Sequence, residues 1–330
     1  MEEFTFEPIR DKYTEDIKNN SIASRTSNPE LAIHPSGCVL TYNFKNNFSK
    51  VRDFEVFPDD VWIVTYPKCG TTWTQEMVWL LKNNLDFETA KSTHLRERSP
   101  FLELALIMSE DEGKLSEIPD TIKLAAQAKR PRCIKSHLPV ELLPKALWTV
   151  KPKIVHVSRD PRDVAISYYH HYRIWNGYQG SLENFTEAFL ADRIIYSPFW
   201  SHLLGFWNLT DHHNHLLLNT FEDMKKDLPG VIRKTAKFLD VEVTDQQVEK
   251  LGEHLSFKSM KNNNKVNYLD LVNEVKDELK TKDNDLTFIR KGESGGWRNI
   301  YSTVMLEKFK KWTTAALTGT PYKEHPYSSI

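Results

Sequence analysis

The sequence has few cysteines and no long apolar run. Among its 330 residues are three cysteines, too few and too odd in number for a disulfide framework. No apolar run approaches the roughly 18 residues that a membrane span requires. The first residues also lack the basic and apolar regions of a secretory signal peptide. These absences favour a protein of the reducing cytoplasm and predict no membrane partner.

The sequence also lacks an excess of charge of either sign. Its 44 Lys and Arg residues balance 45 Asp and Glu residues, which leaves a net charge of −1. A general nucleic-acid binder usually carries a clear basic excess, so we expect no nucleic-acid partner. With 40% hydrophobic and 12% aromatic residues, the composition is that of a globular chain long enough for one large core.

No linker rich in Pro or Gly divides the chain, and it contains no repeat. We therefore predict one domain over residues 51–330. Residues 1–50 are polar and rich in Asn and Ser, and we expect an irregular segment packed on the core. The charged and Asn-rich segments 261–265 and 274–285 predict a mobile surface, which could form a flap near the site.

Short apolar runs alternate with helical patterns along the chain, which predicts an α/β fold with a central parallel sheet flanked by helices. The expected strands cover residues 61–65, 132–136, 153–158 and 214–219. Ligands of such sheets bind beyond the carboxyl ends of the strands. Polar residues follow three of these strands directly, so we expect one site there that contains Lys68, Lys135, His137 and Arg159.

The segment 66–73 has the sequence YPKCGTTW and follows the first of these strands. A strand, a short loop with Lys and Gly, and a helix start together form a cradle for an anion, because loop amides and the helix dipole converge there. The lysine precedes the glycine, so this is not the P-loop of nucleoside-triphosphate-binding proteins. An ordinary strand–helix connection with a solvated lysine is the alternative.

A second glycine-rich segment, residues 290–299, has the sequence RKGESGGWRN. It places two adjacent cations beside three glycines, and such a segment can fold over an anion with its backbone amides exposed to it.

Together these two segments resemble the cytosolic sulfotransferase family, which uses 3′-phosphoadenosine 5′-phosphosulfate (PAPS). Three further segments of that family, 131–139, 158–169 and 221–224, lie between them in the same order, and the resemblance covers roughly residues 55–310. It implies a fold related to the P-loop kinases. It also implies sulfuryl transfer to a hydroxyl or amine of a small apolar or aromatic acceptor, which leaves adenosine 3′,5′-bisphosphate (PAP).

The resemblance implies three catalytic side chains. His137 would be the general base, because an imidazole suits proton removal near neutrality. Lys68 would neutralise the bridging oxygen of PAPS, and Lys135, on the same strand face as His137, would stabilise the transferring group. No metal is expected. The histidines at 212, 213 and 215 lack the cysteine or carboxylate pattern of a zinc site.

The cofactor contacts implied by the resemblance fall into three groups. The loop in segment 66–73, called the anion loop below, would bind the phosphosulfate with Lys68, Cys69, Gly70, Thr71 and Thr72. Adenine would lie near Trp73, Phe221, Ser256 and Phe257. Phe221 and Leu255 stand where many relatives have a tyrosine and a threonine, which removes two hydroxyls. The 3′-phosphate would be held by Arg159, Ser167, Arg290, Lys291 and Gly292.

Aromatic residues are the candidates for the acceptor pocket, namely Phe101, Tyr169 and Trp175. A nucleotide or nucleoside kinase is the alternative enzyme, disfavoured by the missing G-K-[ST] and the absence of a clear acid for Mg²⁺. A non-catalytic small-molecule carrier of the same fold is a third possibility.

Two weaker expectations concern association and thiol chemistry. Residues 298–307 partly match the short segment through which many relatives dimerise, which predicts a weak homodimer. Cys69 lies beside Lys68 and a helix N-terminus, both of which lower the pKa of a thiol. A half-buried, unreactive thiol is the alternative.

Overall fold

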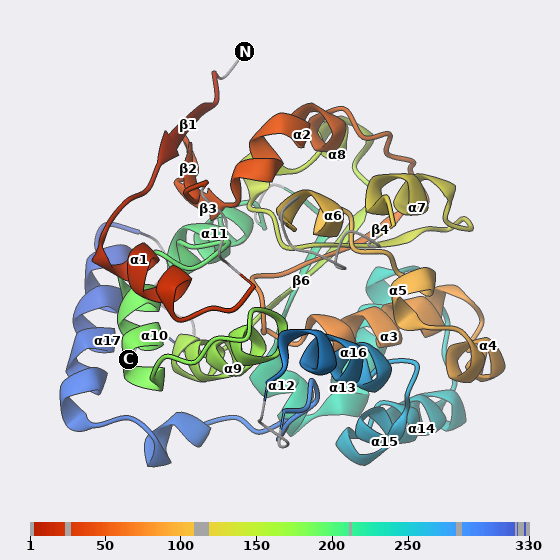
Figure 1. The fold of residues 1–330 in the computed structure, drawn as a ribbon. Helices are drawn as coiled ribbons and strands as arrows, with labels where there is room; N and C mark the ends of the chain where they lie inside the picture. Colours follow the sequence, from red (N-terminus) through yellow and green to blue (C-terminus); the bar gives the residue numbers. More distant parts are fainter. Residues whose placement is uncertain are drawn as a thin grey trace.

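The centre of the protein is a four-stranded parallel sheet. The computed structural model describes residues 3–23, 28–108, 119–210, 213–281 and 286–320, with Tyr322 and Tyr327. The strands lie in the order β5, β4, β6, β7, and their bounds are Cys133–Ser136, Val61–Val64, Lys153–Ser158 and Leu216–Thr220. Helices flank this sheet (Figure 1). The predicted fold class is therefore confirmed, with strand bounds within two residues of those expected.

The alternation of side chains along each strand divides the core into two layers. In β4, Trp62 and Val64 belong to one apolar cluster, whereas Val61 and Ile63 belong to the other. Every residue of β4 is buried, because helices cover both faces of the sheet. On the first face lies α9 (Pro161–Trp175), and on the second lies α3 (Thr71–Lys82).

The remaining helices surround these layers (Figure 1). Within the described residues they include α4 Phe87–Ser92, α5 Leu95–Arg98, α6 Leu104–Ile107, α7 Thr121–Gln127, α8 Leu147–Val150, α10 Leu182–Leu190, α11 Phe199–Trp207, α12 Phe221–Lys226, α13 Leu228–Phe238, α14 Asp245–His254 and α17 Thr303–Leu317, with the 3₁₀ turns η2 Val140–Leu142 and η3 Gly296–Asn299. None of the helices in the described part of the chain is long and apolar enough to span a bilayer.

The N-terminal segment is not irregular, so that expectation was wrong. It forms an antiparallel sheet of β1 (Thr5–Pro8), β2 (Leu31–His34) and β3 (Cys38–Leu40), together with α1 (Lys12–Asn19) and α2 (Tyr42–Arg52). Its strands are too short for their apolar alternation to stand out in the sequence. In β2, for example, only Leu31 and Ile33 are buried. The segment shares an apolar cluster with Trp62 of β4. The division after residue 50 stays a prediction, and that point lies within α2.

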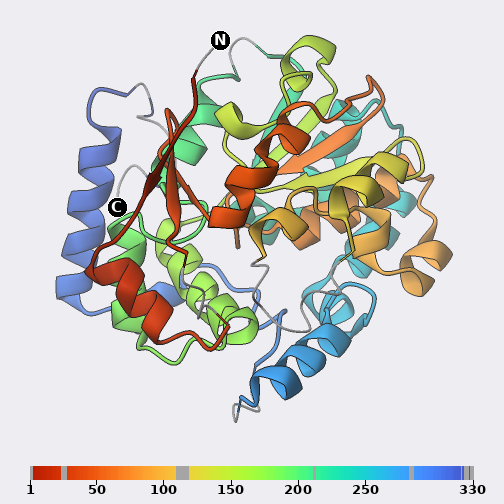
Figure 2. The ribbon, with the colours of Figure 1, turned by 45° about the horizontal axis from the view of Figure 1, so that its top comes forward.

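The segment before the C-terminal glycine-rich loop also contains more regular structure than expected. Residues predicted as a mobile surface form the end of α15 (Phe257–Asn262) and much of α16 (Leu269–Leu279), whereas residues 282–285 lie outside the described residues. Val272 and Val275 of α16 are buried, and the helix packs on α9. Figure 2 shows α16, in blue, at the lower edge of the molecule. Because only these two valines mark the buried face of α16, the sequence pattern did not predict this helix among so many charged residues.

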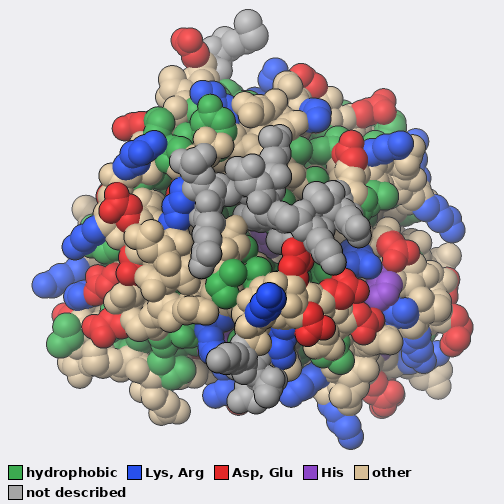
Figure 3. Space-filling view, in the orientation of Figure 1, with side chains coloured by type: hydrophobic (Ala, Val, Ile, Leu, Met, Phe, Trp, Pro, Cys, Tyr) green, Lys and Arg blue, Asp and Glu red, His purple; other side chains and the backbone are tan. Residues whose placement is uncertain are grey.

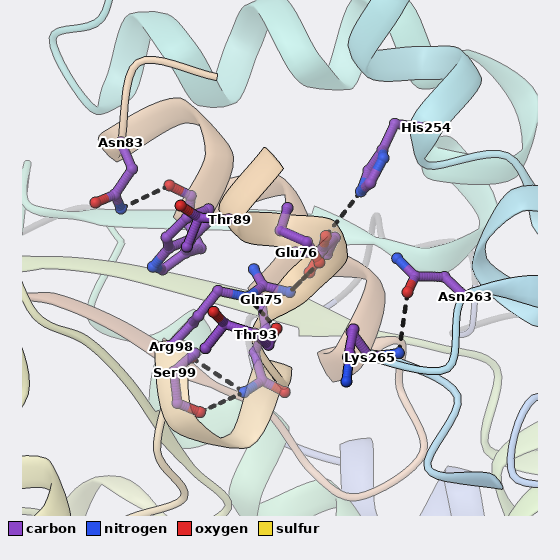
Figure 4. A network of polar contacts seen from close by, with 12 residues as sticks. Gln75, Glu76, Asn83, Thr89, Thr93, Arg98, Ser99, His254, Asn263 and Lys265 are labelled. Carbon is purple, nitrogen blue, oxygen red and sulfur yellow. Dashed lines mark hydrogen bonds and ion pairs between the residues drawn. The ribbon is translucent and has the colours of Figure 1, made fainter. Parts of the chain in front are cut away.

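A buried polar network fixes α3 to the elements beside it (Figure 4). One carboxylate oxygen of Glu76 accepts from Arg98 Nη2 of α5 at 2.7 Å, and the other lies 2.7 Å from His254 Nε2 of α14. Glu76 is 0% exposed, and its two partners are also buried. The helix α3 begins at the anion loop, and α14 ends just before Phe257. The network therefore fixes the anion loop and Phe257 relative to each other.

We expect the Arg98→Met substitution to lower the free energy of unfolding by about 3–5 kcal/mol, because it leaves Glu76 buried with one partner fewer. Urea denaturation of the purified protein measures this change. The control is Arg233→Met, which removes the exposed ion pair of Arg233 with Asp245 and should cost about 0–1 kcal/mol. Equal losses in the two variants would contradict the assignment.

Candidate active site

The anion loop connects β4 to α3 through two residues with left-handed backbone. Lys68 has φ 69° and Gly70 has φ 105°. A Cβ atom on residue 70 would lie 3.0 Å from Phe221 Cδ2, so glycine is required there by both conformation and space. Gly70 is also the N-cap of α3 and has no side chain to accept from the first amides of Thr71 and Thr72. These amides are therefore available to an anion.

Two lysines belong to the site, Lys68 in this loop and Lys135 in β5. Burial lowers the pKa of both. Lys68 Nζ donates to His171 Nδ1 at 3.3 Å and lies 4.5 Å from the ring centre of Phe288. Burial, followed by the charges of Lys135, Arg159 and Arg290, lowers the pKa of Lys68 to about 7. Burial also lowers the pKa of Lys135 to about 8, and its Nζ lies 4.0 Å from the ring centre of Phe101.

His137 follows β5 and is held in one tautomer. Its Nδ1 lies 2.7 Å from the backbone oxygen of Thr65, and a carbonyl oxygen only accepts, so Nδ1 carries the hydrogen and Nε2 keeps its lone pair. The ring packs between Phe101 and Tyr196. Burial, then the charge of Lys135, lowers the pKa of His137 well below 6.5. The imidazole is therefore a neutral proton acceptor at neutral pH.

Two buried residues that the sequence analysis missed hold the backbone of His137. Glu103 Oε1 accepts the His137 N–H at 2.7 Å, and His202 Nε2 of α11 donates to the His137 carbonyl at 3.1 Å. Burial raises the pKa of Glu103 to about 7, against the opposing hydrogen bond from His137. In the sequence Glu103 follows Leu102 in a loop and resembles a solvated acid, so no local pattern indicated this role.

Arg159, directly after β6, joins the two glycine-containing loops. Its Nη1 donates to the Lys68 carbonyl at 3.2 Å and its Nη2 to the Glu293 carbonyl at 2.7 Å. The guanidinium lies over the ring of Phe221, 4.2 Å from its centre. Its Nε is buried and finds no hydrogen-bond partner among the described residues. An anion at this point would complete the coordination of Arg159.

The C-terminal loop is anchored to the first turn of α9. Asp160 caps this helix and Pro161 occupies its first position, as predicted from the sequence. Asp163 accepts from the amides of Gly295 at 2.6 Å and Trp297 at 3.1 Å. Gly292, with φ 61°, lies against Phe257, and a Cβ there would come within 2.4 Å of that ring. The anchoring fixes the segment that carries Arg290 and Lys291.

A cavity of about 2170 Å³ contains most of the predicted site residues. Acidic side chains gather on the surface over α16 (Figure 3), and Glu274, Asp277 and Glu278 of that helix line the cavity. The predicted residues that line it are Lys68, Gly70, Thr71, Thr72, Trp73, Phe101, Lys135, His137, Arg159, Ser167, Trp175, Phe221, Phe257, Arg290, Lys291 and Gly292.

Three predicted residues do not line this cavity. Tyr169 packs against Tyr178 and Phe185, because it lies more than half a helical turn from Ser167 on α9. Ser256 caps α15 and accepts from the Ser259 amide at 3.2 Å. Cys69 belongs to the anion loop, but it is 0% exposed.

The structure favours the unreactive thiol at Cys69 over the reactive one. Burial raises its pKa above the ordinary range, and the lowering effect of Arg159 and Lys68 is smaller. Proximity to cations was visible in the sequence, whereas the burial that outweighs it was not.

The chemistry of the cavity fits a ligand with phosphates and a flat ring. Uncapped amides, lysines and arginines meet at one end, and Trp73, Phe221 and Phe257 supply aromatic surface beside them. The indole Nε1 of Trp73 is also buried without a partner among the described residues. In the part of the chain that the structure describes, no cluster of three His, Cys, Asp or Glu residues could hold a metal ion, and His212 lies outside that part.

Comparison with known proteins gives one consistent result. A model of the sulfotransferase domain matches residues 58–321. The chain is 39% identical to luciferin sulfotransferase of Photinus pyralis, over 88% of this chain and 80% of that protein. It is 34% identical to sulfotransferase 1B1 of Canis lupus familiaris, over 86% and 92%. Its fold matches a crystal structure of retinol dehydratase in complex with androsterone and the inactive cofactor PAP, with a TM-score of 0.87, 29% identity and 98% of both chains covered.

The burial of all three cysteines predicts that the folded protein has no fast-reacting thiol. Cys38, Cys69 and Cys133 are buried and unpaired, and burial raises the pKa of each. In a titration with Ellman's reagent at pH 8, we expect colour to develop slowly in buffer and rapidly for three thiols in denaturant. A single thiol that reacts within seconds in the native protein, and is lost in Cys69→Ser, would contradict the burial.

Proposed function

The chain belongs to the sulfotransferase domain family, and we propose that His137 is its general base. The protein is an enzyme that transfers a sulfuryl group from PAPS to a small-molecule acceptor. The observation that supports the proposal most strongly is the hydrogen bond from His137 Nδ1 to the Thr65 carbonyl. Because Nδ1 holds the hydrogen, Nε2 is the atom that takes the proton of the acceptor hydroxyl or amine.

Lys68 and Lys135 are proposed to supply positive charge to the transfer. When bound, PAPS supplies the sulfuryl group and a phosphate leaving group. Lys68, on the anion loop, carries the charge that stabilises the bridging oxygen as negative charge develops there, and Lys135 stabilises the transferring group. Burial lowers the pKa of both lysines, and the charges of Lys135, Arg159 and Arg290 lower that of Lys68 further. The positive field at Lys68 is favourable to an anion.

The remaining cofactor contacts are proposed from the positions of the cavity residues. Arg159, Ser167, Arg290 and Lys291 line one region and would hold the 3′-phosphate. The aromatic side chains of Trp73, Phe221 and Phe257 would bind adenine, which gains apolar burial on such faces. Phe221 stands between these two groups, since it contacts Trp73 and lies under Arg159.

The acceptor is proposed to be a small hydroxylated molecule that is apolar or aromatic. One relative of this chain is named for luciferin, and the structural relative was crystallised with androsterone. Around His137 the cavity presents Phe101 and Tyr196, and further along it Trp175 and Phe288. Tyr169 is not part of this proposal.

Incubation of the protein with ³⁵S-labelled PAPS and a panel of phenols, alcohols and amines tests the proposed function. The panel includes retinol and androsterone, and the labelled products are separated by chromatography. Transfer to apolar or aromatic hydroxyls supports the proposal. Binding of PAP without transfer to any acceptor would indicate a non-catalytic carrier of the same fold.

For the general base we expect His137→Ala to lower kcat with an aliphatic alcohol by roughly a hundred- to ten-thousandfold. Affinity for PAP should stay unchanged, because the phosphate contacts are on other residues. The kcat for acidic phenols should fall less, because an acidic hydroxyl releases its proton with less assistance from a base. Near-normal turnover of the alcohol at saturating PAPS would remove His137 from the mechanism.

The pH dependence of the unmodified enzyme gives a second signature of His137. Its pKa lies well below 6.5 because of burial and the charge of Lys135, so the imidazole is already neutral at pH 7. As pH falls, kcat/KM should therefore decline only below about 6.5, and this limb should be absent from the residual activity of His137→Ala. An acid limb centred above pH 7 would contradict the neutral base.

For the 3′-phosphate contact we expect Arg290→Ala to weaken PAP binding by roughly ten- to a hundredfold, the effect of one charge-assisted hydrogen bond. Binding of adenosine 5′-phosphate, which lacks the 3′-phosphate, should change little. Isothermal titration calorimetry compares the two ligands. Equal weakening would show that Arg290 supports the loop and does not contact the phosphate.

A cytoplasmic location and a weak homodimer complete the proposal. Unpaired buried thiols fit a reducing compartment. In the segment 298–307, Ile300 is 43% and Val304 68% exposed, unusual values for large apolar side chains. Light scattering at tens of micromolar should show a dimer that Val304→Asp dissociates, whereas Leu269→Asp, at another exposed apolar position, should not. A monomeric mass for the unmodified protein would contradict the dimer.

A further inference from the structure

His171 is a polar side chain in the cavity that has no role in the mechanism described above. It lies on α9, one helical turn after Ser167, and both residues line the cavity. Its ring packs against aromatic side chains, with centroid distances of 5.8 Å to Tyr168, 6.0 Å to Trp175 and 6.2 Å to Phe288. An imidazole in such surroundings offers one of the few hydrogen-bonding atoms on an otherwise apolar wall.

The partner of His171 is the lysine of the anion loop. Lys68 Nζ lies 3.3 Å from His171 Nδ1. The ammonium form of Lys68 only donates, so beside it Nδ1 is the acceptor and Nε2 carries the hydrogen. Burial, then the charges of Lys68 and Lys135, holds the pKa of His171 well below 6.5. His171 is therefore neutral, and its Nδ1 accepts from the ammonium form of Lys68.

Lys68 cannot satisfy His171 and an incoming anion equally well. A phosphosulfate in the anion loop attracts the Lys68 ammonium more strongly than a neutral imidazole does, since a charge-assisted hydrogen bond is the stronger one. Nδ1 of His171 then loses its donor inside a buried pocket, which is unfavourable unless another donor replaces it. His137 and His171 line the same cavity, and His137 is among the groups whose charge acts on His171. An acceptor molecule at His137 therefore binds next to this position.

We propose that His171 selects acceptors by accepting a hydrogen bond from a second donor group, a hydroxyl or an amine, that lies beside the group to be sulfated. The reacting hydroxyl faces His137 Nε2, and the neighbouring donor faces His171 Nδ1. The enzyme therefore favours vicinal dihydroxy acceptors over monohydroxy acceptors of the same shape. This inference rests on the proposed function and specifies its acceptor class.

Catechol and guaiacol form a matched pair of acceptors for the test, because guaiacol replaces one hydroxyl by a methoxy group and loses one donor. With the unmodified enzyme at saturating PAPS, we expect kcat/KM for catechol to exceed that for guaiacol by roughly tenfold, the effect of one buried hydrogen bond. His171→Phe removes the acceptor atom and should abolish this preference. His171→Asn keeps an oxygen acceptor on the same side and should retain most of it.

The control is His170→Phe, which changes the adjacent residue of α9 that is not among those lining the cavity. It should leave the catechol preference unchanged. Affinity for PAP, measured by calorimetry, should stay within about threefold of normal in every variant, because His171 holds no phosphate. The binding of catechol and guaiacol to the enzyme–PAP complex provides the same comparison without turnover.

The outcomes separate this inference from the proposed function. Sulfuryl transfer with the same catechol-to-guaiacol ratio in the unmodified enzyme and His171→Phe would overturn the inference alone. A parallel loss for both acceptors together with weakened PAP binding would also overturn it, because His171 would then act only by holding Lys68. An absence of transfer to either acceptor, with catechol still bound in preference to guaiacol, would contradict the proposed function and support the recognition by His171.

Discussion

The site depends on four cations that the fold holds close together in a poorly solvated cavity. Lys68 and Arg159 follow β4 and β6, Lys135 lies within the neighbouring strand β5, and Arg290 is brought to them by the C-terminal loop. Burial and mutual repulsion lower the pKa of Lys68 to about 7 and also lower that of Arg290. In the ligand-free state this arrangement is unfavourable, and an anion with several phosphates relieves it. A strong preference for a polyanionic cofactor follows.

The positive charges of the site also set the protonation state of His137, the proposed base. Lys135 is the main charge that lowers the pKa of His137, after burial. A neutral imidazole is what a general base requires, so the cations that attract the cofactor also keep the proposed base in the form that can accept a proton. Thr65, Glu103 and His202 then fix this imidazole in position through its ring and its backbone. Recognition and catalysis are therefore coupled through one set of charges.

Local patterns in the sequence were sufficient for the sheet, the anion loop and the start of α9, because each depends on neighbours in the chain. The run 61–64, the glycine at 70 and the pair Asp160–Pro161 have their structural reasons within a few residues. Properties that depend on distant packing were not accessible in this way. The burial of Cys69 and the contact of His171 with Lys68 both come from elements far apart in sequence.

Proton uptake on binding of PAP tests the central claim most directly. At pH 8 the phosphates of PAP are already deprotonated, since their second pKa is about 6, whereas Lys68 and Lys135, with pKa values of about 7 and 8, are largely or partly neutral. Calorimetry in buffers of different ionisation enthalpy should show an uptake of roughly one proton per PAP bound, reduced in Lys68→Arg. An uptake of zero, or a release of protons, would contradict a cofactor site made of buried, mutually repelling cations.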